Sequence, residues 1–79
     1  MMNNLSKFIK LKRKTENLTQ EELSLKAGVG LRFIRELEQG KETLRMDKVN
    51  LVLSLFGHEL SPTKINKEKR KEIIFGTLT

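Results

Sequence analysis

"LTQEELSLKAGVGLRFIRELEQGK", residues 18–41, contains two short helical patterns separated by a glycine. Thr19 can accept a backbone N–H of the next turn, and Glu22 lies three residues further on, which is the capping box that starts a helix. Gly28 stands where a helix end often needs a left-handed residue, and the second helical pattern begins soon after it. This stretch therefore predicts two helices joined by a tight turn.

The second of these helices carries different chemistry on its two sides. Its inner side is apolar apart from one carboxylate: Leu31, Ile34, Leu37 and Glu38. Its outer side is polar: Arg32, Glu36 and Gln39, at positions i, i+4 and i+7. Arg35 and Phe33 lie on the flanks, where Phe33 is expected to fill the core. The outer charges either form a solvated face or recognise a partner.

A further helix is predicted on each side of this pair. Residues 4–14 place Leu5 and Ile9 one turn apart, and the same stripe then carries Arg13 into the buried side. Residues 46–56 place five apolar side chains at helical spacing, all of which are expected in the core: Met46, Val49, Val52, Leu53 and Phe56.

Glycines and a proline indicate where these elements end. Gly40 closes the second helix of the pair, and Gly57 closes the last helix. Residues 58–65, HELSPTKI, predict a loop or a short edge strand, because Pro62 cannot donate to a strand ladder.

Size and composition restrict the class of protein. A chain of 79 residues has room for one domain, and a domain this small hides only about 60% of its unfolded surface. The chain has no cysteine, which excludes disulfides and favours a reducing, cytoplasmic location. No apolar run approaches the roughly 20 residues that cross a bilayer, so the chain is expected to be soluble, with no membrane-spanning segment. A net charge of +6 favours nucleic acid, acidic proteins or anionic membrane as partner.

Titratable residues argue against an enzyme. Catalysis needs convergent groups, and this chain has one histidine, no cysteine and a single aspartate, Asp47. His58 lacks the second histidine or cysteine of a metal site, so it is expected in a turn or a dimer contact. Gly28 and Gly30 lack the lysine of a phosphate-binding loop. We expect no catalytic residue, no metal and no cofactor.

Residues 18–41 resemble the Cro and lambda-repressor (XRE) helix-turn-helix family at fixed spacing, through Gln20, Gly28, Ile34, Leu37, Glu38 and Gly40. The resemblance covers residues 4–57. It implies an all-α, compact, lambda-repressor-like domain of four to five helices in residues 1–57, and a dimerisation strand or loop with a partner-binding tail in residues 58–79. The chain departs from the family at Gly30, where a serine or threonine usually caps the helix and touches a phosphate, and at Leu44, where proline is common.

A narrower likeness covers residues 30–60, GLRFIRELEQGKETLRMDKVNLVLSLFGHEL, which look like the HipB antitoxins, the partners of HipA-like kinase toxins. It implies a dimeric repressor of its own toxin–antitoxin operon that also binds the toxin. Two alternatives stay open: a phage-type or restriction-controller repressor without a toxin, and a protein-binding inhibitor whose DNA binding is vestigial.

An ion pair is expected between the first helix and the second helix of the motif. Glu38 falls on a buried side, and a buried carboxylate needs a partner. In the family, an arginine of the first helix pairs with this glutamate, and Arg13 is the matching residue here. Removing one partner of such a pair should cost about 3 kcal/mol.

The family's second motif helix enters the major groove, which assigns base-reading roles to its outer residues. Arg32 can donate two bonds to guanine, and Glu36 can accept one from cytosine N4. An exposed ion pair with Arg32 is the alternative role for Glu36, and Arg35 is the second cation expected to hold it. Leu31 either touches a thymine methyl group or packs in the core. The expected phosphate contacts are Thr19, Gln20, Gln39, Lys41 and Arg45.

One reading helix spans few base pairs, so specific binding predicts a homodimer whose two helices lie about 34 Å apart on palindromic double-stranded DNA. A lone short strand needs a partner in water, so residues 58–65 are expected to pair across the dimer. The apolar C-terminus is expected to dock on the dimer mate, on a toxin or on its own domain. The residues expected in these contacts are His58, Leu60, Ile73, Ile74 and Phe75.

Overall fold

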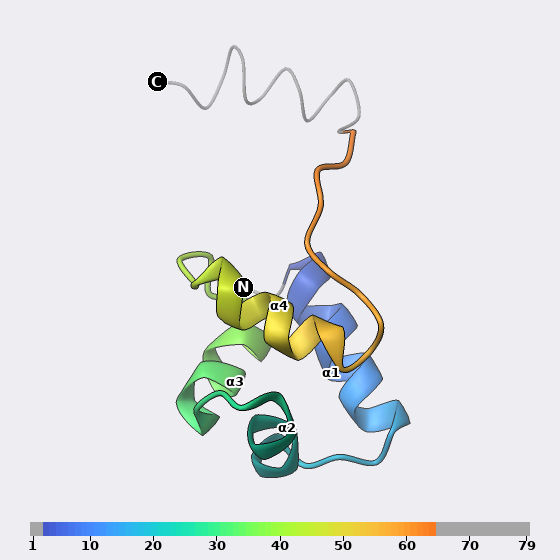
Figure 1. Ribbon diagram of the computed structural model, residues 1–79, viewed down its shortest axis with the longest axis vertical. Coiled ribbons are helices and arrows are strands. Elements are labelled where there is room, and N and C mark those ends of the chain that lie inside the picture. The colour runs from blue at the N-terminus through green and yellow to red at the C-terminus, as the bar shows by residue number, and fades with distance from the viewer. Residues whose placement is uncertain (1–2, 65–79) are drawn as a thin grey trace.

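The computed structural model describes residues 3–64, which contain four helices. They are α1 (Asn4–Thr15), α2 (Gln20–Ala27), α3 (Leu31–Glu38) and α4 (Met46–Ser54), as Figure 1 shows. No strand occurs between residues 3 and 64. The prediction of an all-α fold is confirmed, and α2 and α3 are the two short helices that the sequence indicates.

Side-chain caps start the first two helices. Thr19 Oγ1 accepts the Glu22 N–H at 3.0 Å, and Glu22 Oε1 accepts the Thr19 N–H at 2.9 Å, which is the predicted capping box. α1 begins with a second capping box that the sequence analysis did not anticipate, because its third position is a serine rather than glutamate or glutamine. There, Asn3 Oδ1 and Ser6 Oγ each accept the other residue's N–H at 2.8 Å.

Left-handed glycines end α2 and close the turn after α3. Gly28 has φ 72° and leaves room for α3 to start three residues later. Gly40 has φ 87°; its N–H reaches Leu37 O at 3.2 Å, and the Lys41 N–H reaches Glu36 O at 3.1 Å. This pair of bonds is the Schellman motif, in which the chain folds back over the last helical turn. Residue 41 is thereby brought back to Glu36.

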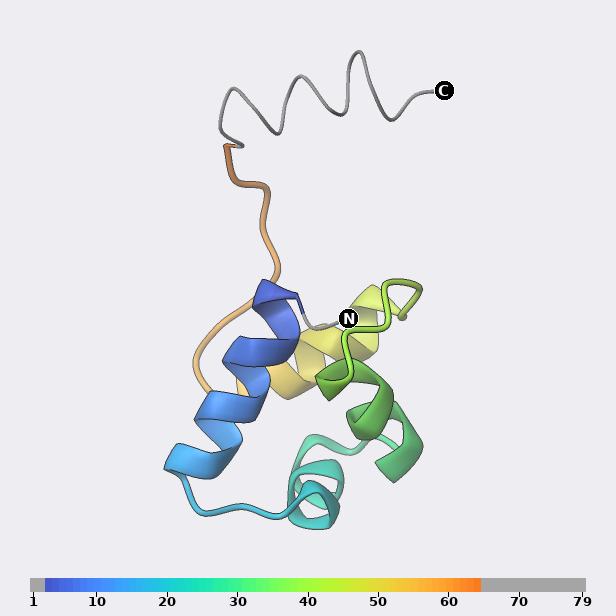
Figure 2. The ribbon, with the colours of Figure 1, turned by 180° about the vertical axis from the view of Figure 1, so that it is seen from behind.

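The core gathers side chains from all four helices. α3 packs against both α1 and α2, and α4 packs against α2 (Figure 2). The buried apolar residues are Ile9, Leu23, Ala27, Ile34, Leu37, Val49, Val52 and Leu53. Phe33 and Phe56 are partly buried against this cluster.

The prediction that Met46 belongs to the core is wrong. Its side chain is 67% exposed, although Val49, one turn later on α4, is buried. Met46 is the first residue of α4, and this end of the helix lies at the rim of the molecule, where it lines a surface groove with Leu5 and Leu44. Helical spacing gives the side on which a residue lies, but not whether another element covers that turn.

Residues 58–64 form an irregular segment rather than the edge strand that the sequence left open. Leu60 packs on the core, and its N–H donates to Asn50 Oδ1 at 2.8 Å. In both ribbon views the segment leaves the domain at the end opposite α2 (Figures 1 and 2). In the part of the chain that the structure describes, no helix has the length and apolarity needed to span a membrane.

Candidate nucleic-acid interface

A buried ion pair joins α1 to α3. Arg13 Nε lies 2.6 Å from Glu38 Oε2, and Arg13 Nη2 lies 3.0 Å from Glu38 Oε1, so the contact is bidentate. The two side chains are only 12% and 4% exposed. The third donor, Nη1, reaches the carbonyl of Leu18 at 2.8 Å. Hydrogen bonding to Glu38 raises the pKa of the Arg13 guanidinium above its usual value.

α2 joins the same cluster through Gln20. Its Nε2 donates to Glu38 Oε1 at 3.2 Å, so both carboxylate oxygens of Glu38 are satisfied. Among the described residues, every buried side-chain nitrogen and oxygen has a hydrogen-bond partner. One carboxylate therefore links α1, α2 and α3 and holds α3 against the other two helices.

The outer side of α3 holds an exposed charged group of three residues: Arg32, Glu36 and Lys41. Lys41 Nζ lies 2.9 Å from Glu36 Oε2, and Arg32 Nε lies 3.8 Å from the same oxygen. The Arg32 side chain is 91% exposed, whereas that of Glu36 is 26% exposed. The hydrogen bond from Lys41 lowers the pKa of the Glu36 carboxyl below its usual value. Arg32 and Glu36 thus lie one turn apart on the surface of α3.

The expectation that Arg35 is the second cation holding Glu36 is wrong, because Lys41 takes this place. Adjacent residues on a helix point about 100° apart, so residue 35 has poor access to the carboxylate of residue 36. Lys41 gains access through the Schellman turn at Gly40, which returns the chain to Glu36. Arg35 is exposed on the flank of α3.

The start of α3 differs from the polar outer face. Leu31 is partly exposed at the first position of the helix, outside the buried core. Gly30 is the N-cap and makes no side-chain cap hydrogen bond, and a Cβ added there would meet no atom within 4 Å. Phe33 packs against the core, with Lys48 Nζ 5.9 Å from its ring centroid.

Among the five residues predicted to meet phosphates, all but Gln39 already have side-chain partners within the described part of the chain. Thr19 caps α2, Gln20 binds Glu38, and Lys41 binds Glu36. Arg45 makes a bidentate contact with Asp47, with nitrogen–oxygen distances of 3.1 and 2.6 Å. Gln39 is exposed at the C-cap of α3. The exposed pairs are weak in water, so a phosphate can compete for Lys41 and Arg45.

A family model described as helix-turn-helix matches residues 9–61, which is more than half of the chain. The chain belongs to the helix-turn-helix family. It is similar to an uncharacterized HTH-type transcriptional regulator, y4mF, from Sinorhizobium fredii (strain NBRC 101917 / NGR234). The two sequences are 50% identical over 50 residues, which cover 63% of this chain and 66% of the regulator. The expected XRE-type helix-turn-helix domain is thereby confirmed, on a match that spans slightly less than two thirds of the relative.

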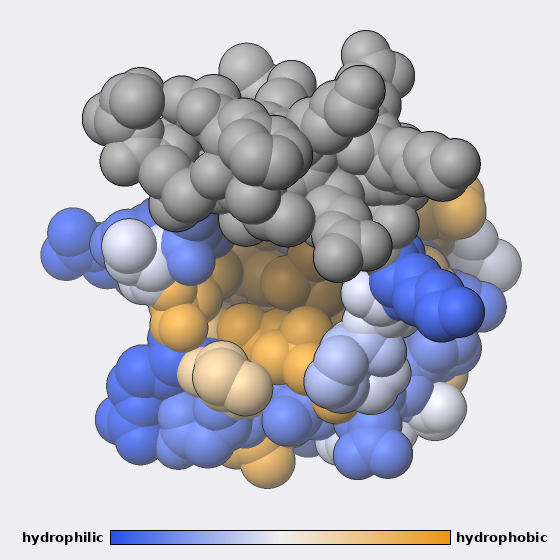
Figure 3. Space-filling view, turned by 90° about the horizontal axis from the view of Figure 1, so that it is seen from above, coloured by the Kyte–Doolittle hydropathy of each residue, from blue (hydrophilic) through white to orange (hydrophobic). Residues whose placement is uncertain are grey.

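At the opposite end from α2, this helix-turn-helix protein has an apolar surface. Seen from above, hydrophobic side chains gather in a hollow between polar walls (Figure 3). Leu5, Leu44, Met46 and Leu60 line a groove that joins the starts of α1 and α4 to the segment after α4. Lys41 also lines this groove, so the apolar surface borders the charged group on the outer side of α3.

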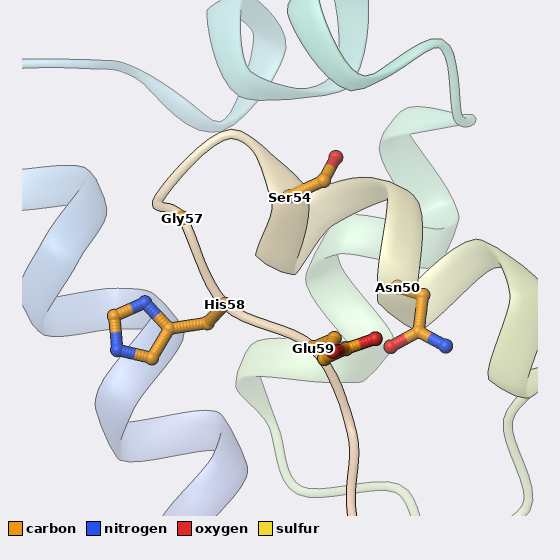
Figure 4. Close-up of a pocket in the computed structure, with 5 residues that line it drawn as sticks. All are labelled: Asn50, Ser54, Gly57, His58 and Glu59. Carbon is orange, nitrogen blue, oxygen red and sulfur yellow. The ribbon is translucent and has the colours of Figure 1, made fainter.

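His58 and Leu60, two of the residues expected in a dimer, contact their own domain. The His58 ring packs on Phe8, with centroids 4.6 Å apart and planes inclined by 60°. Asn50, Ser54 and Glu59 line a small surface pocket with His58, but the ring points toward α1 and away from Asn50 and Glu59 (Figure 4). The other expected contact residues, Ile73, Ile74 and Phe75, lie outside the described residues.

Two contacts in this helix-turn-helix architecture were not predicted from the sequence. The cap formed by Asn3 also reaches the turn after α3, because Asn3 Nδ2 donates to Gly40 O at 3.4 Å. The contact from Lys41 to Glu36 was missed because the two residues are five positions apart, outside the usual helical pairs. The glycine one residue before Lys41 was the available signal.

Proposed function

We propose that this chain is a sequence-specific DNA-binding transcriptional regulator in which α3 reads base edges in the major groove. The observation that carries the proposal is the exposed row formed by Arg32 and Glu36, on a helix fixed by the buried pair of Arg13 and Glu38. A reading helix needs exposed polar groups on a rigid support, and α3 has both. The family match and the name of the relative support the same role.

Each base contact follows from the chemistry of one side chain. Arg32 offers two parallel N–H groups, which match O6 and N7 of guanine, and Glu36 offers a carboxylate oxygen to cytosine N4. Leu31 stands at the start of α3, where an apolar group meets a thymine methyl. Arg35, exposed on the flank of α3, is proposed to contact a neighbouring base. Phosphate contacts then come from Thr19, Gln20, Gln39 and Arg45, and Lys41 either joins them or stays bound to Glu36.

Selection from a library of random DNA duplexes tests this proposal. The full chain should enrich a short motif, and the preference for guanine at one position of this motif should depend on Arg32. Arg32→Ala should lower the preference for that guanine by roughly 5- to 150-fold, which corresponds to about 1 to 3 kcal/mol, while the rest of the motif is retained. Lys14→Ala, which removes one exposed charge at the end of α1, should leave the motif unchanged. Failure of the unaltered chain to enrich any motif would contradict the proposal.

We propose further that the regulator is a homodimer on a palindromic site, in which a second copy covers the apolar groove. One α3 reads only a few base pairs, and the groove, which Lys41 borders, offers an apolar surface for a second copy at the end away from α2. Met46, 67% exposed at the rim of the groove, is the residue to change. Sedimentation at about 1 to 50 μM should show a dimer for the unaltered chain and a monomer for Met46→Lys. A monomer for both would contradict this assignment.

The finer assignment is an autoregulating repressor and antitoxin for a HipA-like kinase toxin. It rests on the resemblance of residues 30–60 to the HipB group. A neighbouring gene for a kinase-like protein, and formation of a stable complex between the two purified proteins, are the expected results. DNA binding without such a complex favours a phage-type or restriction-controller repressor. A complex without sequence-specific DNA binding favours an inhibitor whose DNA binding is vestigial.

A further inference from the structure

The C-terminal end of α3 holds Lys41 over the outer face of the helix. The positive φ of Gly40 lets the Lys41 N–H bond to Glu36 O at 3.1 Å. The side chain then makes a second contact with the same residue, because Lys41 Nζ lies 2.9 Å from Glu36 Oε2. Backbone and side chain of Lys41 are therefore both bound to Glu36.

The two cations that approach Glu36 contact only one of its carboxylate oxygens. Lys41 Nζ and Arg32 Nε lie 2.9 and 3.8 Å from Oε2. For the residues that the structure describes, no hydrogen bond to Glu36 Oε1 is found. An ionised carboxylate is purely an acceptor, so Oε1 can take a donor from outside the protein. Lys41 thus restrains a side chain that is 26% exposed, and Oε1 remains as an acceptor without a partner among the described residues.

We propose that Lys41 is a positioning residue that holds Glu36 so that Oε1 accepts a hydrogen bond from the exocyclic amino group of cytosine. The proposal rests on the DNA-reading function proposed for α3. A glutamate free to change rotamer would lose side-chain entropy on binding, and its charge would be repelled by nearby phosphates. The ammonium group of Lys41 reduces both penalties, because it restricts the side chain and neutralises its charge. Specificity for cytosine at one position then belongs to Glu36 and Lys41 together.

A direct phosphate contact by Lys41 is the competing role, and the geometry favours it less. If Lys41 turned to a phosphate, Glu36 would keep only the longer contact to Arg32 at 3.8 Å. Arg32 is itself 91% exposed and is needed for its own base in the proposed function. The negative charge of Glu36 would then face the DNA phosphates with little neutralisation by a cation. The Schellman turn also fixes the Lys41 backbone beside Glu36.

Duplex selection with four variants of the full chain tests the positioning role. The unaltered protein should enrich cytosine at one position of the motif, and Glu36→Gln should replace this preference with adenine. Lys41→Met should lower the cytosine preference from about tenfold or more to about threefold or less, with the guanine read by Arg32 still enriched. Lys41→Arg should restore the cytosine preference, because the guanidinium can make the same contact. Lys7→Met, which removes an equal charge on α1, should leave the whole motif unchanged.

Titration of each variant with the selected duplex at several salt concentrations separates the two roles of Lys41. The positioning role would be overturned if Lys41→Met bound all duplexes more weakly to the same extent and kept the cytosine preference. In that case the slope of the logarithm of the binding constant against the logarithm of salt concentration should also be smaller by about 1. An unchanged motif for Glu36→Gln would also overturn it. If the unaltered protein selects no motif at all, the DNA-reading function itself fails. Circular dichroism on every variant shows that changes in preference come from folded protein.

Discussion

The two carboxylates of α3, Glu38 and Glu36, are two residues apart and bind cations in opposite environments. Glu38 is 4% exposed and takes a bidentate contact from Arg13, which is also largely buried. Glu36 lies on the outer face, where Lys41 and a fully solvated Arg32 approach one of its oxygens. Removing one partner of the buried pair leaves an uncompensated charge in the protein interior, whereas water can replace either partner of the outer ion pairs. The first group therefore sets the position of α3, and the second is free to recognise a ligand.

The largest effect is expected from breaking the buried pair on one side. Glu38→Leu should lower the free energy of unfolding by about 3 kcal/mol, because Arg13 keeps its charge and loses its carboxylate partner. Urea denaturation followed by circular dichroism measures this. The double variant Arg13→Met, Glu38→Leu should recover most of the loss, since two apolar side chains of similar volume need no partner. A single variant that costs under about 1 kcal/mol would show that the pair does not hold α3.

A smaller loss is expected at Gly40, which forms the turn between Glu38 and Lys41. Gly40→Ala should cost about 1 to 2 kcal/mol, because its φ of 87° is strained for a residue with a Cβ. The same change should loosen the turn that returns Lys41 to Glu36. Denaturation measures the first effect, and duplex selection measures the second as a weaker preference for cytosine. Unchanged stability would mean that the turn adopts another conformation without cost.

Acid should reduce stability through the exposed carboxylates. The bond from the Thr19 N–H lowers the pKa of Glu22, and the bond from Lys41 lowers that of Glu36. Since the folded pKa of each group lies below the unfolded value of 4.5, the unfolded chain binds protons first as the pH falls. Their contributions are present above pH 4.5 and are lost as the pH falls through the folded values. Denaturant midpoints measured from neutral pH to below 4 should fall, and less steeply for Glu22→Gln.

The smallest effect on stability is expected on the outer face. Arg32→Ala should leave the denaturant midpoint unchanged within error, because the side chain is 91% exposed and its contact to Glu36 spans 3.8 Å. A clear loss of stability would mean that the outer group is structural, and the contrast with the pair of Arg13 and Glu38 would disappear.

Local patterns in the sequence predicted most of the fold. The capping box at Thr19, the left-handed glycine at position 28 and the spacing of apolar residues place α2 and α3 correctly. These features depend on neighbours within one or two helical turns, which the sequence displays directly. The apolar stripes put Arg13 and Glu38 on buried sides, but their pairing across 25 residues was predicted from the resemblance to the XRE family, and the structure shows it.

The contacts that the sequence did not predict depend on how the chain returns after a helix ends. Lys41 reaches Glu36 only through the turn at Gly40, and helical spacing favoured Arg35 instead. Met46 follows the apolar pattern of α4 but lies beyond the elements that could cover it. Both errors arise because the spacing of apolar residues describes one helix by itself. The contact of Lys41 depends on the path of the loop after α3, and the exposure of Met46 depends on which elements cover the start of α4.

Fluorescence anisotropy measures whether the outer face of α3 reads bases. The duplex enriched by the unaltered chain is titrated against a scrambled duplex at two salt concentrations, with the full chain and with Arg32→Ala. The full chain should prefer its own duplex, and Arg32→Ala should lower this preference by roughly 5- to 150-fold while keeping salt-dependent binding to both duplexes. Equal preference in the two proteins would contradict a base-reading role for α3.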